Sequence, residues 1–132
     1  MFRQLFNLMV PKKGKTMVID LTPQDVQKKL SAHEIILIDV REPREFASER
    51  IHGAYNFPLS TFDPAFLPAG GNLLIVLQCG TGKRSGMAGE KASALHGREF
   101  SHLAGGITAW KEAGLKVINL DPATGAVIDP AA

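Results

Sequence analysis

The sequence predicts an α/β fold built on a mostly parallel sheet. Short apolar, β-branched segments alternate along the chain with segments whose apolar residues recur at helical spacing. Two of the apolar segments, residues 35–38 and 73–77, are continuous, which is typical of parallel strands buried on both faces. The length of 132 residues and the hydrophobic content of 45% fit one soluble globular domain, which we place at residues 17–119.

Residues 1–16 are predicted to form an amphipathic, basic extension in front of this domain. Its apolar residues have the i, i+3, i+4, i+7 spacing of one helical face: Phe2, Leu5, Phe6 and Met9. Lysines follow at positions 12, 13 and 15. We expect this helix either to pack on its own domain or fray, or to bind a partner or a membrane surface.

The first half of the domain is predicted to contain two strands separated by a capped helix. The strands span residues 17–20 and 35–38. Between them, Thr22 suits an N-cap, Pro23 the first helical position and Asp25 the third, so we expect a helix from 23 to about 30. Shorter elements then follow: a helical turn at 43–47, an extended piece at 54–58 and a loop rich in Pro and Gly at 64–71.

The second half is predicted to begin with the central strand of the sheet. Residues 73–77 are the most apolar run of the chain, which favours the middle of the sheet. A helix is expected from Ser85 to a C-terminal Gly97, followed by a strand at 100–103 and a helix at 107–113 closed by Gly114. Pro122, Gly125 and Pro130 indicate a loosely ordered tail at residues 120–132.

Composition excludes several classes of function. A net charge of +2, from 15 Lys and Arg against 13 Asp and Glu, is too small to favour nucleic acid as a partner. The first ten residues contain Arg3, Gln4 and Asn7, so they lack the apolar core of a signal peptide or a transmembrane segment. One cysteine cannot form an internal disulfide, and the spacing of His and Cys fits no zinc site. We therefore expect a free thiol, no metal and a cytoplasmic location.

The loop that begins with this cysteine has the composition of an active site. It follows the predicted central strand, where ligands bind in open α/β sheets. Two glycines allow several backbone N–H groups to converge on one point, and a helix start and two cations should stabilise a thiolate there. A buried structural thiol would not explain this crowding of glycine and cations. The candidate residues are the catalytic Cys79 and the substrate-binding Gly80, Thr81, Gly82, Lys83, Arg84 and Ser85.

The same residues resemble the active-site loop of the rhodanese family. The likeness extends through residues 17–117. Upstream, the matching residues are Leu21-Thr22-Pro23, Asp25, Asp39-Val40-Arg41, Glu45-Phe46, Ile51, Gly53-Ala54, Asn56 and Pro58. Downstream, they are Leu103, Gly105-Gly106-Ile107 and Ala109-Trp110. Departures occur at Glu49, Arg50 and His52, at peripheral positions that bear on the choice of partner more than on chemistry.

The resemblance implies a central five-stranded, mostly parallel sheet with helices on both faces. It also implies a sulfurtransferase in which Cys79 takes sulfane sulfur from thiosulfate, polysulfide or a similar small donor. The persulfide then passes sulfur to cyanide or to a thiol, including a protein thiol. No cofactor is implied. Asp39 and Arg41 are expected to support the loop or to form a purely structural ion pair, and Trp110 to anchor the core. His33, His52, His96 and His102 are assigned no catalytic role.

Two alternatives stay open from the residues alone. Phosphatases and arsenate reductases of this architecture also use a cysteine and an arginine around an anion-binding loop. Their loops are longer, whereas here only four residues lie between Cys79 and Arg84, which suits a single sulfur atom better than a tetrahedral oxyanion. The second alternative is a sulfur-carrier or regulatory module that holds the persulfide for one protein partner without free turnover.

Overall fold

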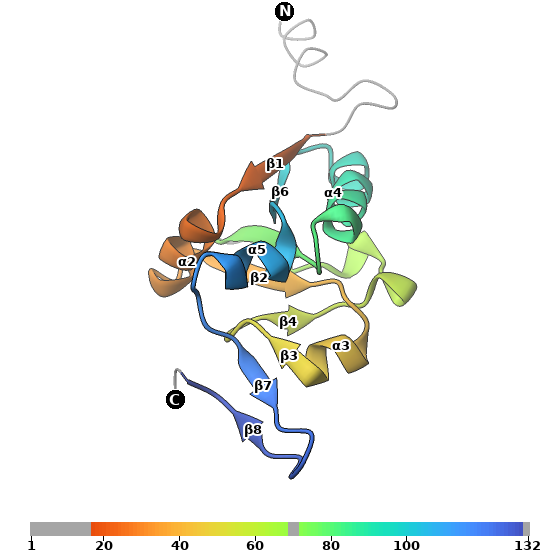
Figure 1. Cartoon of the computed structure of the whole chain (residues 1–132). Helices are drawn as coiled ribbons and strands as arrows, with labels where there is room; N and C mark the ends of the chain where they lie inside the picture. Colours follow the sequence, from red (N-terminus) through yellow and green to blue (C-terminus); the bar gives the residue numbers. More distant parts are fainter. Residues whose placement is uncertain (1–16, 69–71, 131–132) are drawn as a thin grey trace, which may run out of the picture.

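The computed structural model describes residues 17–68 and 72–130, and it contains a five-stranded parallel sheet. The strands are β1 (Val18–Leu21), β2 (Ile35–Asp39), β4 (Tyr55–Asn56), β5 (Leu74–Gln78) and β6 (Phe100–Leu103). Their order across the sheet is β1-β6-β5-β2-β4, and every neighbouring pair is parallel (Figure 1). The most apolar run of the sequence therefore forms the middle strand, as predicted.

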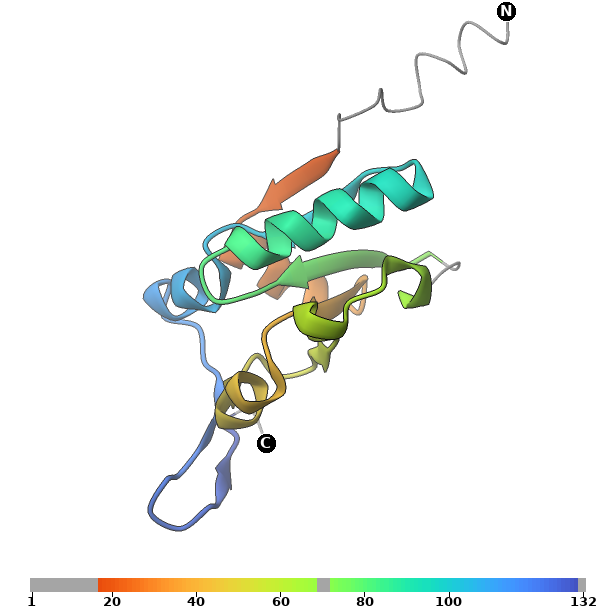
Figure 2. The ribbon, with the colours of Figure 1, turned by 90° about the vertical axis from the view of Figure 1, so that its right-hand side faces the viewer.

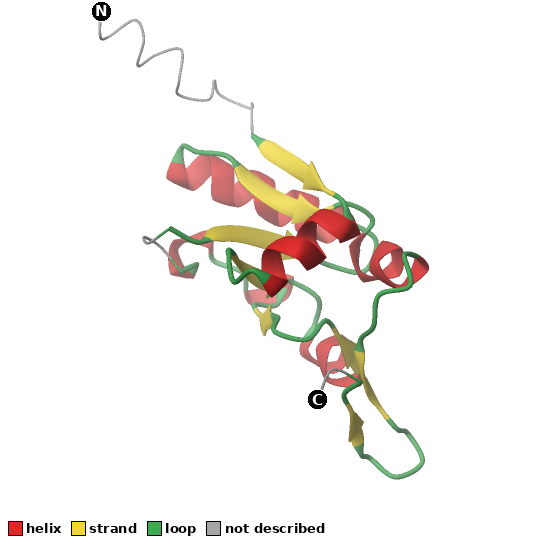
Figure 3. Ribbon diagram, turned by 90° about the vertical axis from the view of Figure 1, so that its left-hand side faces the viewer, coloured by secondary structure: helices red, strands yellow, loops and turns green. Residues whose placement is uncertain are grey.

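Helices cover both faces of this sheet, which confirms the predicted fold class. One face carries α2 (Pro23–Ser31) and α5 (Gly106–Glu112), and the other carries α4 (Lys83–His96). Figure 2 views the sheet from the side that α4 covers, and Figure 3 views it from the opposite side. The helix α3 (Pro43–Ser48) and the 3₁₀ turns η1 (Leu59–Thr61) and η2 (Pro64–Phe66) complete the domain.

Each face of the sheet has its own apolar core. Val26 of α2 and Trp110 of α5 pack with Leu37 and Val76 on one face, and Trp110 is 4% exposed, which confirms its predicted place as a core anchor. On the other face, Ala88 of α4 packs with residues of β5 and β6. The core of this second face includes Cys79 itself. The position of Cys79 is thus held by the packing between the sheet and α4.

Local signals determine where the helices begin and end. Thr22 and Asp25 form the expected capping box at the start of α2, with the Thr22 side chain accepting a hydrogen bond from the Asp25 N–H at 3.1 Å. Gly97 has the left-handed conformation, with φ of 67°, and ends α4 as predicted. The start of α4 differs from the prediction, because the helix begins at Lys83 rather than Ser85. Its first turn therefore belongs to the Cys79 loop.

The C-terminal segment corrects the prediction of a loosely ordered tail. The strands β7 (Ile118–Leu120) and β8 (Val127–Ile128) form an antiparallel hairpin, and β7 also pairs with β3 (Glu49–Arg50). Gly125 has φ of 75°, and its N–H donates to the Asp121 carbonyl oxygen at 2.7 Å, so this glycine closes a turn. Figure 1 shows the hairpin projecting beyond the main sheet.

The predicted amphipathic extension at 1–16 lies outside the described residues. Within residues 17–68 and 72–130, no helix has the length and apolar character needed to cross a bilayer.

Candidate active site

Cys79 lies directly after the central strand, at the carboxyl end of the sheet, and is 1% exposed. The chain then curls through Gly80 and Thr81 to Gly82, which has φ of 102°. This left-handed conformation is open to glycine and costly for other residues. It directs the Gly82 N–H at the Cys79 Sγ, with N and S 3.1 Å apart. The loop thus closes around the sulfur as the sequence predicts.

Hydrogen bonds within this turn favour the thiolate form of Cys79. Burial acts in the opposite direction and raises the pKa of the thiol. The side chain and N–H of Ser85, together with the N–H groups of Gly82 and Thr81, outweigh burial, so that the net pKa is lowered. Because only the thiolate is a good nucleophile, this arrangement prepares the sulfur for reaction.

The helix α5 holds the loop from the side away from the sulfur. Its Ile107 N–H donates to the Cys79 carbonyl oxygen at 2.8 Å, and its Thr108 N–H donates to the Gly80 carbonyl oxygen at 3.1 Å. A Cβ at Gly106 would lie 2.3 Å from the Cys79 carbonyl oxygen, so only glycine fits there. The N–H and C=O of a peptide point in opposite directions, so fixing these carbonyl groups on α5 leaves the loop's N–H groups free to face the sulfur.

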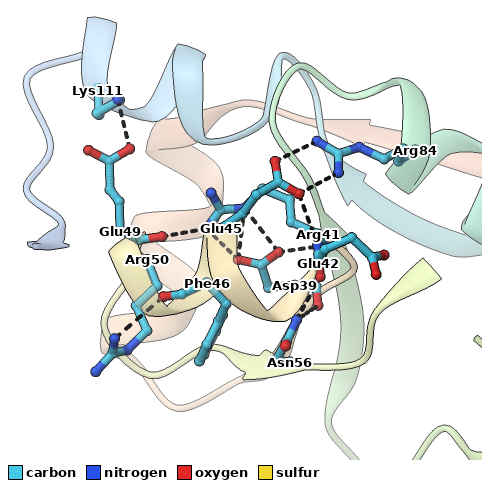
Figure 4. Close-up of polar contacts among 10 residues, drawn as sticks. All are labelled: Asp39, Arg41, Glu42, Glu45, Phe46, Glu49, Arg50, Asn56, Arg84 and Lys111. Atoms are coloured by element: carbon cyan, nitrogen blue, oxygen red, sulfur yellow. Dashed lines mark hydrogen bonds and ion pairs between the residues drawn. The ribbon is translucent and has the colours of Figure 1, made fainter. Parts of the chain in front are cut away.

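Arg84 is tied to the neighbouring helix α3 by a bidentate ion pair. Its two terminal nitrogens contact the Glu45 carboxylate at 2.7 and 3.1 Å (Figure 4). Hydrogen bonding from Arg84 is the main reason that the pKa of Glu45 is lowered to about 2, and the same contact raises the pKa of Arg84. The guanidinium also lies against Gly80, where a Cβ would be 3.2 Å from Nη2. Arg84 therefore bridges the loop and α3.

Asp39 and Arg41 form a buried ion pair beside the loop rather than a direct contact with the sulfur. Arg41 donates to both carboxylate oxygens of Asp39 at 2.9 to 3.2 Å and also to the Glu49 carbonyl oxygen. Asn56 donates to the carbonyl oxygens of both residues. These contacts fix the segment that leads into α3, which carries Glu45 (Figure 4). The pair can support the loop through α3 and also through the sheet, because Asp39 is the register partner of Gln78, the residue before Cys79.

The remaining loop residues divide into exposed and buried groups. Thr81 and Lys83 are exposed, so Lys83 lies at the mouth of the site as the first residue of α4. Ser85 is fully buried, and its Oγ lies 3.3 Å from the Gly82 carbonyl oxygen and 2.8 Å from His102 Nδ1. The structure thus brings all seven residues 79–85 into one turn, with Asp39 and Arg41 in the adjoining layer.

Sequence reasoning did not assign three residues that the structure brings into this network. Glu45 pairs with Arg84, and His102 contacts both Ser85 and Asp20. Glu45 belonged to a recognised motif, but its partner lies 39 positions away. His102 and Asp20 are partners in the parallel register of β1 and β6, which requires the strand order to be known. The signal available in the sequence was the alternation of residues along β1 and β6, the two strands at one edge of the sheet.

Among the described residues, no group of three or more His, Cys, Asp or Glu side chains is arranged to hold a metal ion. A cavity of about 790 Å³ is lined in part by Leu30, Leu37 and Trp110, and its walls include none of residues 79–85. The geometry around Cys79, rather than this cavity, makes the candidate active site, because that is where a nucleophilic side chain and backbone N–H donors meet.

Comparisons with known proteins agree with this geometry. Residues 22–113 match the family described as the rhodanese-like domain. An uncharacterized protein of Synechocystis is 38% identical over 100 residues, covering 76% of this chain and 56% of that protein. The probable adenylyltransferase/sulfurtransferase MoeZ of Mycobacterium tuberculosis is 38% identical over 106 residues, covering 74% of this chain. The chain spans only 25% of the length of MoeZ.

A solved structure shares the fold. The crystal structure of a rhodanese-related protein from Thermoplasma volcanium superposes with a TM-score of 0.65 and 28% sequence identity. The match covers 75% of this chain and 96% of that one. The fold is therefore one that this chain has in common with that structure.

Proposed function

Because the chain belongs to the rhodanese-like domain family, we propose that it is a sulfurtransferase that carries sulfane sulfur as a persulfide on Cys79. The observation that carries the proposal is the short loop whose Gly82 N–H lies 3.1 Å from the cysteine sulfur. MoeZ, which matches over part of its length, has sulfurtransferase in its name, and this supports the same class of reaction. The cytoplasm, where a single thiol stays reduced, is the proposed location.

In the first half-reaction, the Cys79 thiolate attacks the outer sulfur of thiosulfate or of a similar donor. The S–S bond of the donor breaks, and the rest of the donor, which is sulfite when the donor is thiosulfate, leaves with the bonding electron pair while Cys79 becomes a persulfide anion. The N–H groups of Thr81, Gly82 and Ser85 already lower the thiol pKa. We propose that they also stabilise the negative charge on the outer sulfur, as oxyanion-hole donors do for oxygen.

In the second half-reaction, cyanide or a thiolate attacks the outer sulfur of the persulfide. The bond between the two sulfur atoms breaks, and the electron pair returns to Cys79 as a thiolate. The products are thiocyanate or a persulfide on the acceptor, so the two steps balance without a further oxidant or reductant. No cofactor takes part in this scheme.

The cations have different roles in this proposal. Lys83 is exposed at the mouth and would attract anionic donors through long-range charge. Arg84 has two of its nitrogens on Glu45, so only its remaining N–H groups can reach a sulfonate. We therefore assign the grip on the donor chiefly to the backbone N–H groups of the loop, with Arg84 keeping Gly80 and α3 in place.

Steady-state assays of sulfur transfer and phosphate release test this function. We expect thiosulfate and cyanide to yield thiocyanate with the native protein, and Cys79→Ser to abolish that turnover because no second cysteine can replace it. Aryl-phosphate hydrolysis should stay at background, since the loop is too short to surround a phosphoryl group. Efficient phosphate release, or thiocyanate formation by the Cys79→Ser protein, would overturn the proposal. Loading of Cys79 without transfer to cyanide or small thiols would indicate a dedicated carrier instead.

A further inference from the structure

A cavity of about 790 Å³ lies on the face of the sheet that α2 and α5 cover, the side viewed in Figure 3. Its inner wall includes Leu37 of β2 and Trp110 of α5, which are both buried in the core. Its rim carries two large apolar side chains that are open to solvent, Tyr55 at 61% and Leu73 at 45% exposed. The volume falls in the range of small-molecule sites, about 300 to 1,000 Å³. The cavity is thus large enough to hold an apolar ligand.

This cavity lies at the opposite end of the sheet from Cys79. Its lining includes residues 35–37 at the start of β2 and Leu73, which directly precedes β5, whereas Cys79 follows the last residue of β5. Leu73 and Cys79 are six positions apart in the sequence, which corresponds to about 20 Å along a strand. A ligand in the cavity would therefore leave the site of sulfur transfer open.

The walls of the cavity carry basic side chains and, among the described residues, no carboxylate. The basic residues are His33, His52 and Lys116. His52 is paired with Asp129 at 2.9 Å. Within residues 17–68 and 72–130, His33 and Lys116 form no ion pair, so their side chains are available to a ligand. An anionic group would find a complementary charge at this wall, and a cationic group would be repelled.

The ends of α2 and α5 also border the cavity, and their carbonyl groups offset this positive charge only in part. A helix C-terminus is partially negative because its last four carbonyl groups lack partners within the helix. In α2, three of the last four carbonyl oxygens accept from the N–H groups of residues 32–34. In α5, three of the last four accept from residues 113–115. The full charge of Lys116 therefore exceeds the partial charge that remains at the two helix ends.

We propose that this cavity binds a small aliphatic carboxylate of the fatty-acid class, with its chain against the apolar walls and its head group near Lys116. The site is separate from the proposed sulfur transfer and goes beyond it. Two other occupants match the charge less well. Residues 1–16 carry Arg3 and three lysines but no carboxylate. A twofold dimer through this face would bring the basic wall against its own copy.

Titration with alkanoates, followed by the fluorescence of Trp110, tests the proposal. Trp110 is the one tryptophan of the chain and lines the cavity, so a bound chain should change its emission. Affinity should rise about fourfold for each methylene added between hexanoate and decanoate, the gain expected from burying one methylene. Decylammonium, which has a similar chain and the opposite charge, should bind roughly fivefold more weakly than decanoate.

Paired variants separate the charge of the head group from the apolar contact. Lys116→Gln keeps most of the side chain but loses the charge, so decanoate should bind up to about fivefold more weakly and uncharged decanol equally well. Lys91→Gln, at an exposed lysine of α4 on the other face, is the control and should leave both affinities unchanged. Leu73→Glu places a carboxylate at the rim and should weaken decanoate binding on the order of tenfold, through lost apolar contact and charge repulsion. Leu95→Glu, at an exposed leucine of α4, should not.

Several results would overturn the proposal. The first is decanoate binding that is unchanged in both Lys116→Gln and Leu73→Glu, or that is matched by decylammonium. A dimer that Leu73→Glu dissociates would show instead that a second copy covers the cavity. A tenfold gain in decanoate affinity on Phe6→Asp would show that residues 1–16 fill it. Decanoate should bind the Cys79→Ser protein as well as the native one, so a failure of sulfur transfer would leave this result independent.

Discussion

The ion pair between Glu45 and Arg84 is the side-chain contact that joins α3 to the Cys79 loop. Both side chains are about one third exposed, at 35% and 33%, so water screens their attraction. Its contribution to stability should therefore stay within the range of surface pairs, about 0.2 to 1 kcal/mol. Its effect on the loop is geometric, because the guanidinium that Glu45 holds also lies against Gly80.

Replacing Glu45 by Gln should destabilise the protein in a pH-dependent way. The pKa of Glu45 is lowered from 4.5 to about 2 in the folded protein, so its charge stabilises the fold above pH 4.5 and this contribution is lost as pH falls toward about 2. Urea unfolding followed by the fluorescence of Trp110, the one tryptophan, should show Glu45→Gln to be less stable at neutral pH and nearly equal to the native protein near pH 2. Glu90→Gln, an exposed change on α4, is the control. A difference that does not change with pH would contradict the assignment to this carboxylate.

At the level of elements, the contact between α5 and the loop positions the turn around Cys79. Gly106 begins α5, and the backbone of the loop packs directly against it, which explains why the Gly105-Gly106-Ile107 motif accompanies the cysteine loop. Two N–H groups of α5 that have no partner within their own helix are satisfied by carbonyl oxygens of the loop. The loop and the helix therefore stabilise each other.

Gly106→Ala should damage both stability and reactivity, because the new Cβ would lie 2.3 Å from the Cys79 carbonyl oxygen. We expect a loss of about 2 kcal/mol or more, and slower persulfide formation as the N–H groups move away from the sulfur. Gly114→Ala is the matched control, since Gly114 also has positive φ, at 81°, but has no neighbouring atom within 4 Å of its Cβ position. It should lose about 1 to 2 kcal/mol from backbone strain alone and keep the native rate of sulfur uptake. Equal loss of sulfur uptake in both variants would contradict a specific role for the α5 contact.

The elements also show which parts of the fold the sequence could predict. The central strand, the capping box at Thr22, the end of α4 at Gly97 and the Cys79 loop all depend on local patterns, and the structure contains them. The hairpin of β7 and β8 was missed because Val127 and Ile128 are exposed and give no core periodicity. Pro and Gly in that segment favour disorder by composition, whereas in the structure Gly125 forms a turn.

For the whole molecule, the contacts that the sequence could not predict are those between segments far apart along the chain. The Cys79 loop was predictable because residues 79–85 are contiguous. The pair of Glu45 and Arg84 spans 39 positions, and that of Asp20 and His102 spans 82. Both depend on the strand order, which periodicity alone does not determine. The fold was therefore predictable to the level of its class, whereas the polar network around the nucleophile required the structure.

The whole chain contains one cysteine, so intact-mass measurement after incubation with thiosulfate tests the central claim most directly. We predict that the native protein gains the mass of one sulfur atom and that a reductant removes it. Cys79→Ser should gain none. A sulfur adduct that persists in the Cys79→Ser protein, or a native protein that takes up no sulfur from thiosulfate or polysulfide, would contradict the assignment of Cys79 as the sulfur carrier.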